Sequence, residues 1–342
     1  LGLRLKSIFR THSNYLSMLS TKASIFILSI ICSSYIFVSC NDTSGGAPGA
    51  ATAREGYFTS EDNIRLYYKM TGQGADTLVV IHGGPGMDSE YMVADFEPLA
   101  DKYKLLFYDQ RGGGRSTLPK DTSQLHMTQH ITDLEALRTH FGFEKMTLVA
   151  HSFGPALAAR YAITHPGRVA RMVFLGPIPP IRENFWERFG DAVNRRLTPQ
   201  EQKELSVQYN AMIEGPDTKE ACRKFWNIAL KPRLAAGRKV SIIKGDCCAA
   251  SPEAIRYGMD ITNSVTINSM GNWDYHGDLP LVTAPTLILH GEEEAIPMDM
   301  VEEWVKAMPH AQLIKVPRAA HFTYVERPDV TWPAIEAFLE KK

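Results

Sequence analysis

The sequence predicts an α/β protein with a mostly parallel sheet, helices on both faces of the sheet and a helical cap insertion. Short apolar runs rich in β-branched residues alternate with segments of helical periodicity, which favours strands buried on both faces. The range 182–278 breaks this alternation, because helix-like segments dominate it. With 342 residues and 44% hydrophobic content, the chain is long enough for one large core with an insertion.

The expected strands are, in chain order, IRLYYKMTG, TLVVIHG, YKLLFYDQR, MTLVAHS, RMVFLGP, TLILHGE and AQLIKVP. Helical segments lie between them; in ITDLEALRTHFGF, for example, Ile131, Leu134 and Leu137 share one stripe. The core is therefore expected in two parts, 56–181 and 279–342, with the cap at 182–278 between them.

The first forty residues predict a bacterial lipoprotein signal peptide. The apolar run ASIFILSIICSSYIFVSC follows Lys22 and ends at Cys40, as in secretory signals. FVSC resembles a lipobox, whose cysteine becomes the lipidated first residue, and 41–55 is a small, polar linker. We expect an exported protein held by a lipid anchor on a bacterial membrane, at the periplasm or the cell surface, with Met18 as a candidate true start. An uncleaved anchor is the alternative, although the run is rather short for a spanning helix.

Charge and cysteine content exclude some classes of function. The net charge is −1 and no basic run is present, which argues against nucleic acid as a partner. Cys222, Cys247 and Cys248 are odd in number and include an adjacent pair, so a dense disulfide framework is not expected. A single bridge from Cys222 to either Cys247 or Cys248 remains open.

Polar or glycine-rich motifs follow the expected strands: HGGPG, DQRGGGRS, HSFG, HGEEE and RAAH. In an open parallel sheet, ligands bind beyond the carboxyl ends of the strands. These motifs should therefore meet at one edge and form a site there.

VAHSFGPALAARYA places Ser152 between a strand and a helix. Ser152 is either a helix cap or a nucleophile on a tight turn. A serine nucleophile needs a base and an orienting acid; His321 fits the base, and Glu294 fits the acid, with Glu293 as the alternative. Each residue alone has a structural explanation, but their order at successive strand ends predicts a catalytic triad.

HGGPG predicts the remaining part of the site, an oxyanion hole. Backbone N–H groups aimed at the developing oxyanion stabilise it, and glycine lets the backbone approach closely. The expected donors are the N–H groups of Gly84 and Phe153. The first glycine usual in such a serine turn is Ala150 here, which is still small enough for a tight turn.

HGGPG, DQRGGGRS, HSFG and AAHFTYVERP together resemble the proline iminopeptidase branch of the α/β-hydrolases, over about 56–181 and 280–342. The resemblance implies that an N-terminal residue, often proline, is released from a peptide through an acyl-enzyme, with no cofactor. It also implies that cap helices bind the free amine. Asp109 and Arg111 are expected to shape their loop.

The resemblance is weaker in the cap, because a Glu-Asn-His-Tyr stretch found in one branch is missing. A buried ammonium needs a carboxylate partner. The candidates are Glu183, Glu187, Glu214 and Asp274, each of which could equally be a solvated charge. Aromatic side chains that would wall a pocket or hold the cap to the core are Phe185, Trp186, Phe225, Trp226 and Trp273.

Two histidines at i, i+4 spacing, His126 and His130, suggest a metal site only if a third ligand joins them. None is evident, so we expect a surface pair and no metal. Two other functions stay open at this point: an esterase or small-amide hydrolase with the same triad, and a non-catalytic binding protein. The sequence determines neither the substrate side chain nor the oligomeric state.

Overall fold

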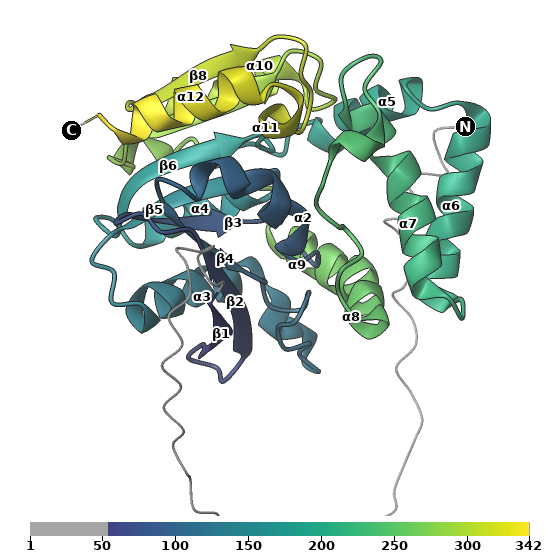
Figure 1. Ribbon diagram of the computed structural model, residues 1–342, viewed down its shortest axis with the longest axis horizontal. Helices are drawn as coiled ribbons and strands as arrows, with labels where there is room; N and C mark the ends of the chain where they lie inside the picture. Colours follow the sequence, from purple (N-terminus) through teal and green to yellow (C-terminus); the bar gives the residue numbers. More distant parts are fainter. Residues whose placement is uncertain (1–53, 342) are drawn as a thin grey trace, which may run out of the picture. The chain divides into compact units, whose positions relative to one another are not determined.

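The computed structural model describes residues 54–341, and its eight strands form one sheet in the order β1-β2-β4-β3-β5-β6-β7-β8 (Figure 1). β1 and β2 are antiparallel to their neighbours, and the six strands from β4 to β8 are parallel. The strands are β1 (Arg54–Thr59), β2 (Arg65–Thr71), β3 (Thr77–Ile81), β4 (Lys104–Tyr108), β5 (Met146–His151), β6 (Val169–Leu175), β7 (Thr286–Gly291) and β8 (Ala311–Val316).

The central strands are buried on both faces. In β5, Leu148 and Ala150 belong to one hydrophobic cluster, and Val149, which points to the opposite face, belongs to another. This alternation follows from the two-residue period of a strand. It explains why the parallel strands appear as continuous apolar runs in the sequence.

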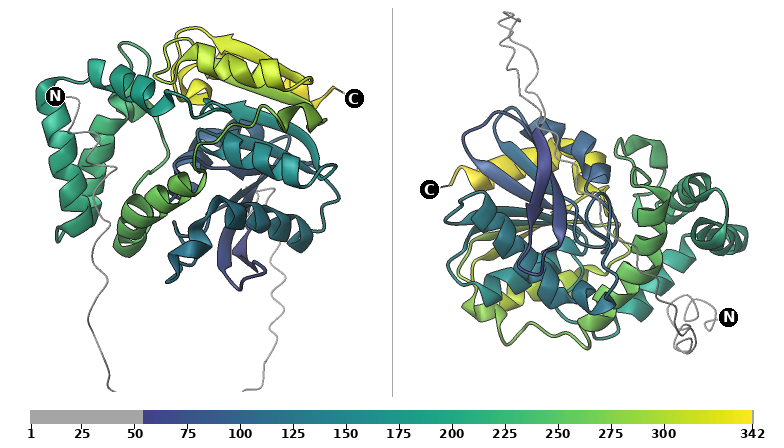
Figure 2. Two further views of the ribbon diagram at one scale, coloured as in Figure 1. Left: turned by 180° about the vertical axis from the view of Figure 1, so that it is seen from behind. Right: turned by 90° about the horizontal axis from the view of Figure 1, so that it is seen from below.

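Helices cover both faces of the sheet (Figure 2). α3 (Met127–His140), α4 (Gly154–Thr164) and α10 (Met298–Ala307) contribute buried residues to the first cluster. The 3-10 helix η1 (Ala94–Leu99) and α12 (Pro328–Leu339) contribute to the second, together with the short helices α2 (Glu90–Val93) and α11 (Thr323–Glu326).

The segment between β6 and β7 is helical and forms the cap, which lies to one side of the sheet in Figures 1 and 2. Its main helices are α5 (Phe185–Arg195), α6 (Pro199–Glu214), α7 (Thr218–Ala229), α8 (Pro252–Tyr257) and α9 (Asn263–Ser269), with the 3-10 turn η3 (Lys231–Arg233) after α7 and the π-helical turn η5 (Gly258–Thr262) between α8 and α9. Side-chain caps fix the starts of three of them: Thr198 for α6, Asp217 for α7 and Ser251 for α8.

The turn η5 rests directly on the loops that follow β3 and β4. A side chain added at Gly86 would lie 2.1 Å from the carbonyl oxygen of Gly258, so the two backbones approach as closely as glycine allows. Thr262 Oγ1 donates to the Gly112 carbonyl at 2.7 Å, and Asn263 Nδ2 donates to the Pro85 carbonyl at 3.1 Å. These contacts attach the cap to the HGGPG and DQRGGGRS loops.

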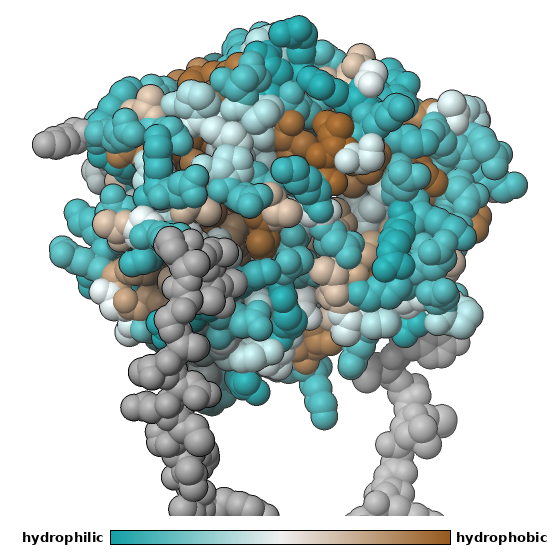
Figure 3. All heavy atoms as spheres, in the orientation of Figure 1, coloured by the Kyte–Doolittle hydropathy of each residue, from teal (hydrophilic) through white to brown (hydrophobic). Residues whose placement is uncertain are grey.

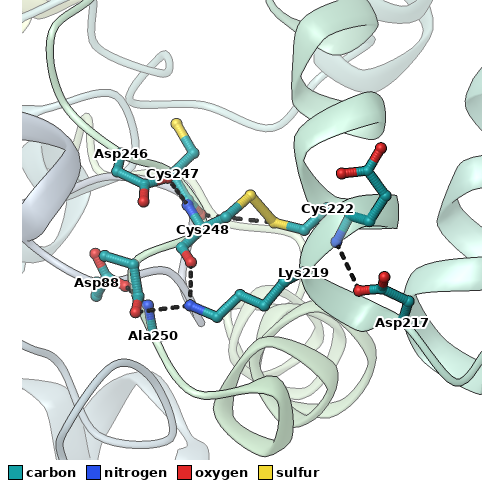
Figure 4. The surroundings of a disulfide bond; sticks show 10 residues. Asp88, Asp217, Lys219, Cys222, Asp246, Cys247, Cys248 and Ala250 are labelled. Atoms are coloured by element: carbon teal, nitrogen blue, oxygen red, sulfur yellow. Dashed lines mark hydrogen bonds between the residues drawn. A yellow bond between two sulfur atoms is a disulfide. The ribbon is translucent and has the colours of Figure 1, made fainter.

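One disulfide, Cys222–Cys248, joins α7 to the loop before α8 (Figure 4). Of the two pairings left open by the sequence, the structure contains this one, and Cys247 is the free cysteine within residues 54–341. Lys219 Nζ donates to the carbonyl of Ala249 at 2.9 Å and to that of Cys248, which fixes the same loop from the other side. Met212 and Ile255 pack with the disulfide in a separate small core within the cap.

The seven expected strands and the helical cap are present, and β1 is an additional strand that the sequence did not predict. β1 begins at Arg54, inside the range predicted as a linker. The predicted signal peptide, Met18, Cys40 and the linker up to residue 53 lie outside the described residues. Within the part that the structure describes, no helix is both long enough and apolar enough to cross a membrane. The face shown in Figure 3 is mostly hydrophilic, with apolar patches scattered over it.

Candidate active site

Ser152 occupies a strained turn between β5 and α4. Its φ angle is 61°, in the left-handed region that non-glycine residues rarely adopt. The Ser152 N–H donates to the carbonyl of Leu175 in the neighbouring strand β6 at 2.9 Å. A side chain at Gly83 would come within 2.6 Å of Ser152 Cβ, so glycine is required there. The turn is the strand-to-helix elbow that presents a nucleophile at the edge of a sheet.

The loop after β3 and the turn after β5 present the two predicted oxyanion donors, Gly84 and Phe153 respectively. The N–H of Gly83 is already used, because it donates to the hydroxyl of Tyr91 at 2.7 Å. Within residues 54–341, the N–H groups of Gly84 and Phe153 donate to no backbone or side-chain acceptor. Both remain able to hold a developing oxyanion.

His321 and Glu294 are in direct contact. His321 Nδ1 lies 2.9 Å from Glu294 Oε2, and the N–H groups of Ala295 and Ile296 donate to Glu294 Oε1 at 2.8 and 3.1 Å. Burial by itself raises the pKa of Glu294, but the facing His321 outweighs it and lowers the pKa to about 2. Glu294 is therefore a fixed negative charge that holds the proton on Nδ1 and leaves Nε2 as the base.

Glu293, the alternative acid, points elsewhere. Its Oε2 accepts a hydrogen bond from the N–H of Ala236 in the cap at 2.8 Å. The structure thus brings Glu294 to His321, and uses Glu293 to attach a cap segment to the core.

The loop after β4 is held by buried polar contacts. The N–H of Gln110 donates to His82 Nε2 at 3.0 Å, so His82 carries its proton on Nδ1, 2.9 Å from the Gly83 carbonyl. Asp109 accepts from the N–H groups of Ser89 and Arg115, both at 2.9 Å. The buried Arg111 pairs with Asp62 and Asp133. These residues shape the loops around Ser152.

A family model described as "alpha/beta hydrolase fold" matches residues 76–328. The chain belongs to the α/β-hydrolase fold family. A proline iminopeptidase from Saccharolobus solfataricus is 28% identical over 81% of this chain and 90% of its own length. One from Xylella fastidiosa is 26% identical over 81% of this chain and 93% of its own. The chain is a serine hydrolase of the proline iminopeptidase-like branch.

Solved structures show the same fold. A proline iminopeptidase from Mycobacterium smegmatis superposes with a TM-score of 0.62 at 24% identity, over 84% of this chain and 97% of its own. An esterase from Thermogutta terrifontis reaches a TM-score of 0.60 at 22% identity, over 84% of this chain and 98% of its own.

The acidic residues predicted to bind a substrate amine lie on the surface of this α/β-hydrolase. Glu183, Glu187, Glu214 and Asp274 are all exposed. Asp274 pairs with His276, with 2.6 Å between Asp274 Oδ1 and His276 Nδ1. The side chains of Glu183 and Glu187 form no hydrogen bond or ion pair with any residue that the structure describes. Amine binding by these residues stays a prediction.

The cap aromatics form two groups. Phe185, Trp186 and Trp273 pack together, and Phe185 also stacks on Phe189. Trp226 contacts Phe225 edge-on and packs against the second core cluster, which includes Tyr91. Both groups hold the cap to the core.

The expectation of a surface histidine pair is wrong for His130, which is buried, while His126 is exposed. His130 Nε2 lies 3.2 Å from Thr266 Oγ1 of the cap, and burial lowers its pKa to about 3. No group of three or more metal-ligating side chains occurs in the described range.

Sequence reasoning missed a network that joins the three loops of the site. The Tyr91 hydroxyl lies 2.7 Å from His151 Nδ1, and His151 Nε2 lies 3.2 Å from the His321 carbonyl. Because a carbonyl oxygen can only accept, Nε2–H donates to it, and Nδ1 of the singly protonated ring accepts from the Tyr91 hydroxyl. Burial keeps the pKa of His151 well below its ordinary value. The histidine before Ser152 in HSFG was the only signal in the sequence.

Arg233 is a further residue that sequence reasoning missed. It ends η3 of the cap, and its Nη1 lies 3.4 Å from His321 Nε2. Its guanidinium is also over the ring of Phe189, 4.9 Å from the centroid. No motif marks this arginine in the sequence.

Proposed function

We propose that this serine hydrolase is an exported aminopeptidase of the proline iminopeptidase type, which releases an N-terminal residue from short peptides. The match to proteins named proline iminopeptidase carries the proposal. It extends over 81% of this chain and at least 90% of two such relatives, so it includes the cap as well as the core.

The geometry supports an acyl-enzyme mechanism. Ser152 attacks the scissile carbonyl, and His321 Nε2 accepts its proton while Glu294 offsets the charge on the imidazolium. The N–H groups of Gly84 and Phe153 hold the oxyanion. His321 then gives the proton to the departing amine, and water releases the acyl group by the same steps.

A second candidate is an esterase or small-amide hydrolase with the same residues. The observation that favours it is the exposure of Glu183, Glu187, Glu214 and Asp274, because an enclosed ammonium needs a carboxylate close to it. Such a hydrolase would bind an uncharged acyl group.

Kinetics on two substrate series distinguish these candidates. Purified protein is assayed on aminoacyl-anilides, with the prolyl anilide among them, and on short acyl esters. Turnover of the prolyl anilide above that of blocked N-acyl-prolyl anilide supports the aminopeptidase. Turnover of esters alone supports the second candidate.

Ser152→Ala is the control in both series, and its turnover should fall on the order of 10⁴-fold or more. Activity above a tenth of wild type would exclude Ser152 as the nucleophile.

Export and lipidation form the part of the proposal that rests on residues 1–40. Cys40→Ser should abolish the incorporation of radioactive fatty acid in cells, because acylation requires that thiol. Equal label in wild type and variant would exclude Cys40 as the anchor, without affecting the proposal for Ser152.

A further inference from the structure

Arg233 places a cation where the leaving group of a substrate must pass. With Nδ1 of His321 bonded to Glu294, Nε2 is the atom that protonates the leaving amine. Arg233 Nη1 lies 3.4 Å from that atom. A group that departs from the acyl carbon is therefore within reach of the guanidinium as it departs.

The position of Arg233 is fixed by the backbone on both sides of it. The N–H of His321 donates to the Arg233 carbonyl at 3.0 Å. Two residues later, the N–H of Ala235 donates to Glu326 Oε1 at 2.6 Å, and the other oxygen of Glu326 accepts from Ala320 N–H at 2.8 Å. The buried carboxylate of Glu326 thus holds the cap segment against the histidine loop.

The charge of Arg233 is uncompensated. This side chain forms no ion pair with any carboxylate among residues 54–341, although it is partly buried. Burial lowers the pKa of the guanidinium, and the more distant Glu294 offsets this only in part. Buried charges are normally paired, and Arg233 has the rings of Phe189 and His321 as its neighbours. Such a cation is suited to an anionic ligand.

We propose that Arg233 binds a carboxylate on the leaving group, so that the preferred substrates are dipeptides, whose C-terminal carboxylate lies one carbon from the scissile nitrogen. This inference rests on the proposed function. In an amino acid the nitrogen and the carboxylate oxygens are about 3 Å apart, which matches the separation of His321 Nε2 and Arg233 Nη1.

The carboxylate also frees the base. Without substrate, the guanidinium donates to the lone pair of Nε2, which is the lone pair that must accept the proton of Ser152. A substrate carboxylate accepts the guanidinium hydrogens more strongly than an imidazole nitrogen, so the hydrogen that faced Nε2 turns to the carboxylate. The new bond forms between Ser152 Oγ and the acyl carbon, the amide C–N bond breaks, and the amino acid leaves with its carboxylate on Arg233.

The test compares prolyl-glycine with prolyl-glycinamide, which differ in the carboxylate alone. Wild type should favour the acid over the amide by about 10- to 100-fold in kcat/KM, since a hydrogen bond between charged groups contributes about 1.5–3 kcal/mol. Arg233→Gln should bring the ratio near one, through loss on the acid, and Arg233→Lys should keep part of the preference. Arg223→Gln is the matched control, because the side chain of Arg223 is exposed on α7 and forms no hydrogen bond or ion pair within the described residues. Its ratio should stay at the wild-type value.

A second substrate pair separates this inference from the proposed function. O-acetylglycolate and O-acetylglycolamide present the same contrast on an ester. One outcome would separate the two proposals: wild type cleaves neither prolyl compound but prefers the acidic ester, and Arg233→Gln removes that preference. The peptidase proposal would then fail, and the role of Arg233 would stand.

Labelling of Ser152 by an uncharged fluorophosphonate shows that each variant is folded, and Arg233→Lys replaces Arg233→Gln if the latter does not label. An acid-to-amide ratio that is near one in wild type, or unchanged in the Arg233 variant, overturns the inference.

Discussion

Glu294 and His321 form a 2.9 Å contact between Oε2 and Nδ1, while the adjacent Glu293 turns away and accepts from the N–H of Ala236 in the cap at 2.8 Å. Two neighbours with the same chemistry therefore have different tasks. Glu294 determines which nitrogen of the imidazole carries the proton, and Glu293 anchors a cap segment. This difference allows a matched pair of substitutions.

Glu294→Gln should lower kcat by roughly 10⁴-fold. An amide N–H₂ facing Nδ1 requires that nitrogen to accept, so the proton moves to Nε2, which can then no longer act as the base for Ser152. Glu293→Gln should keep kcat within about threefold, because its amide oxygen still accepts from Ala236. Steady-state kinetics of both variants on one substrate give the comparison. A large loss at Glu293 with a mild one at Glu294 would assign the orienting role to Glu293.

The pKa of Glu294 also predicts how stability responds to acid. Its folded-state pKa of about 2 is below the ordinary value of 4.5. The ionised carboxylate therefore contributes stability that is fully present above about pH 4.5 and is lost as the pH falls towards 2. At about 1.4 kcal/mol per pKa unit, this contribution is at most about 3 kcal/mol. The free energy of unfolding in urea, measured from pH 7 to pH 3, should fall further in wild type than in Glu294→Gln. Parallel curves would contradict the shift.

Tyr91→Phe tests whether the tyrosine hydroxyl positions the oxyanion loop. The change leaves the Gly83 N–H and His151 Nδ1 without their partner, which should cost about 1–3 kcal/mol of stability. Because Gly84 follows Gly83 directly, we expect kcat to fall by about tenfold or more with KM nearly unchanged. Tyr103→Phe is the control, since the Tyr103 ring is also buried and its hydroxyl forms no hydrogen bond within the described residues. Equal effects of the two changes on kcat would assign Tyr91 a purely structural role.

Features that depend on local sequence were predictable, and features that depend on distant contacts were not. Ser152 follows the buried strand β5 directly, and Glu294 and His321 lie in the loops after β7 and β8, so the apolar runs indicated which loops would form the site. β1 was missed because only Phe58 is buried in it, which leaves no apolar run to recognise. The burial of His130 depends on Thr266, 136 residues further along the chain.

Arg233 was missed for a related reason. It belongs to a short 3-10 turn in the cap, and its approach to His321 depends on Glu326 and Ala235, which hold two loops from different parts of the chain together. No spacing rule connects these residues in the sequence. The choice between Cys247 and Cys248 was similarly open, because adjacent cysteines differ only in the direction that the loop backbone gives them.

The Cys222–Cys248 disulfide should stabilise the folded cap. Cys222 and Cys248 are 26 residues apart, and closing a loop of this length stabilises the folded state by about 3 kcal/mol through the entropy of the unfolded chain. The double variant Cys222→Ser, Cys248→Ser should therefore lose about that amount in urea unfolding, and a reducing agent should lower the stability of wild type to a similar level. Cys247→Ser is the control, because Cys247 is the free cysteine among the described residues, and its stability should match wild type in oxidising conditions.

The bridged loop also contacts the core, since the N–H of Ala250 donates to Asp88 Oδ2 at 3.1 Å. Opening the disulfide should thus raise KM, as the cap becomes less ordered above Ser152. If the stability of Cys247→Ser falls while that of the single variant Cys248→Ser does not, the pairing would involve Cys247 instead.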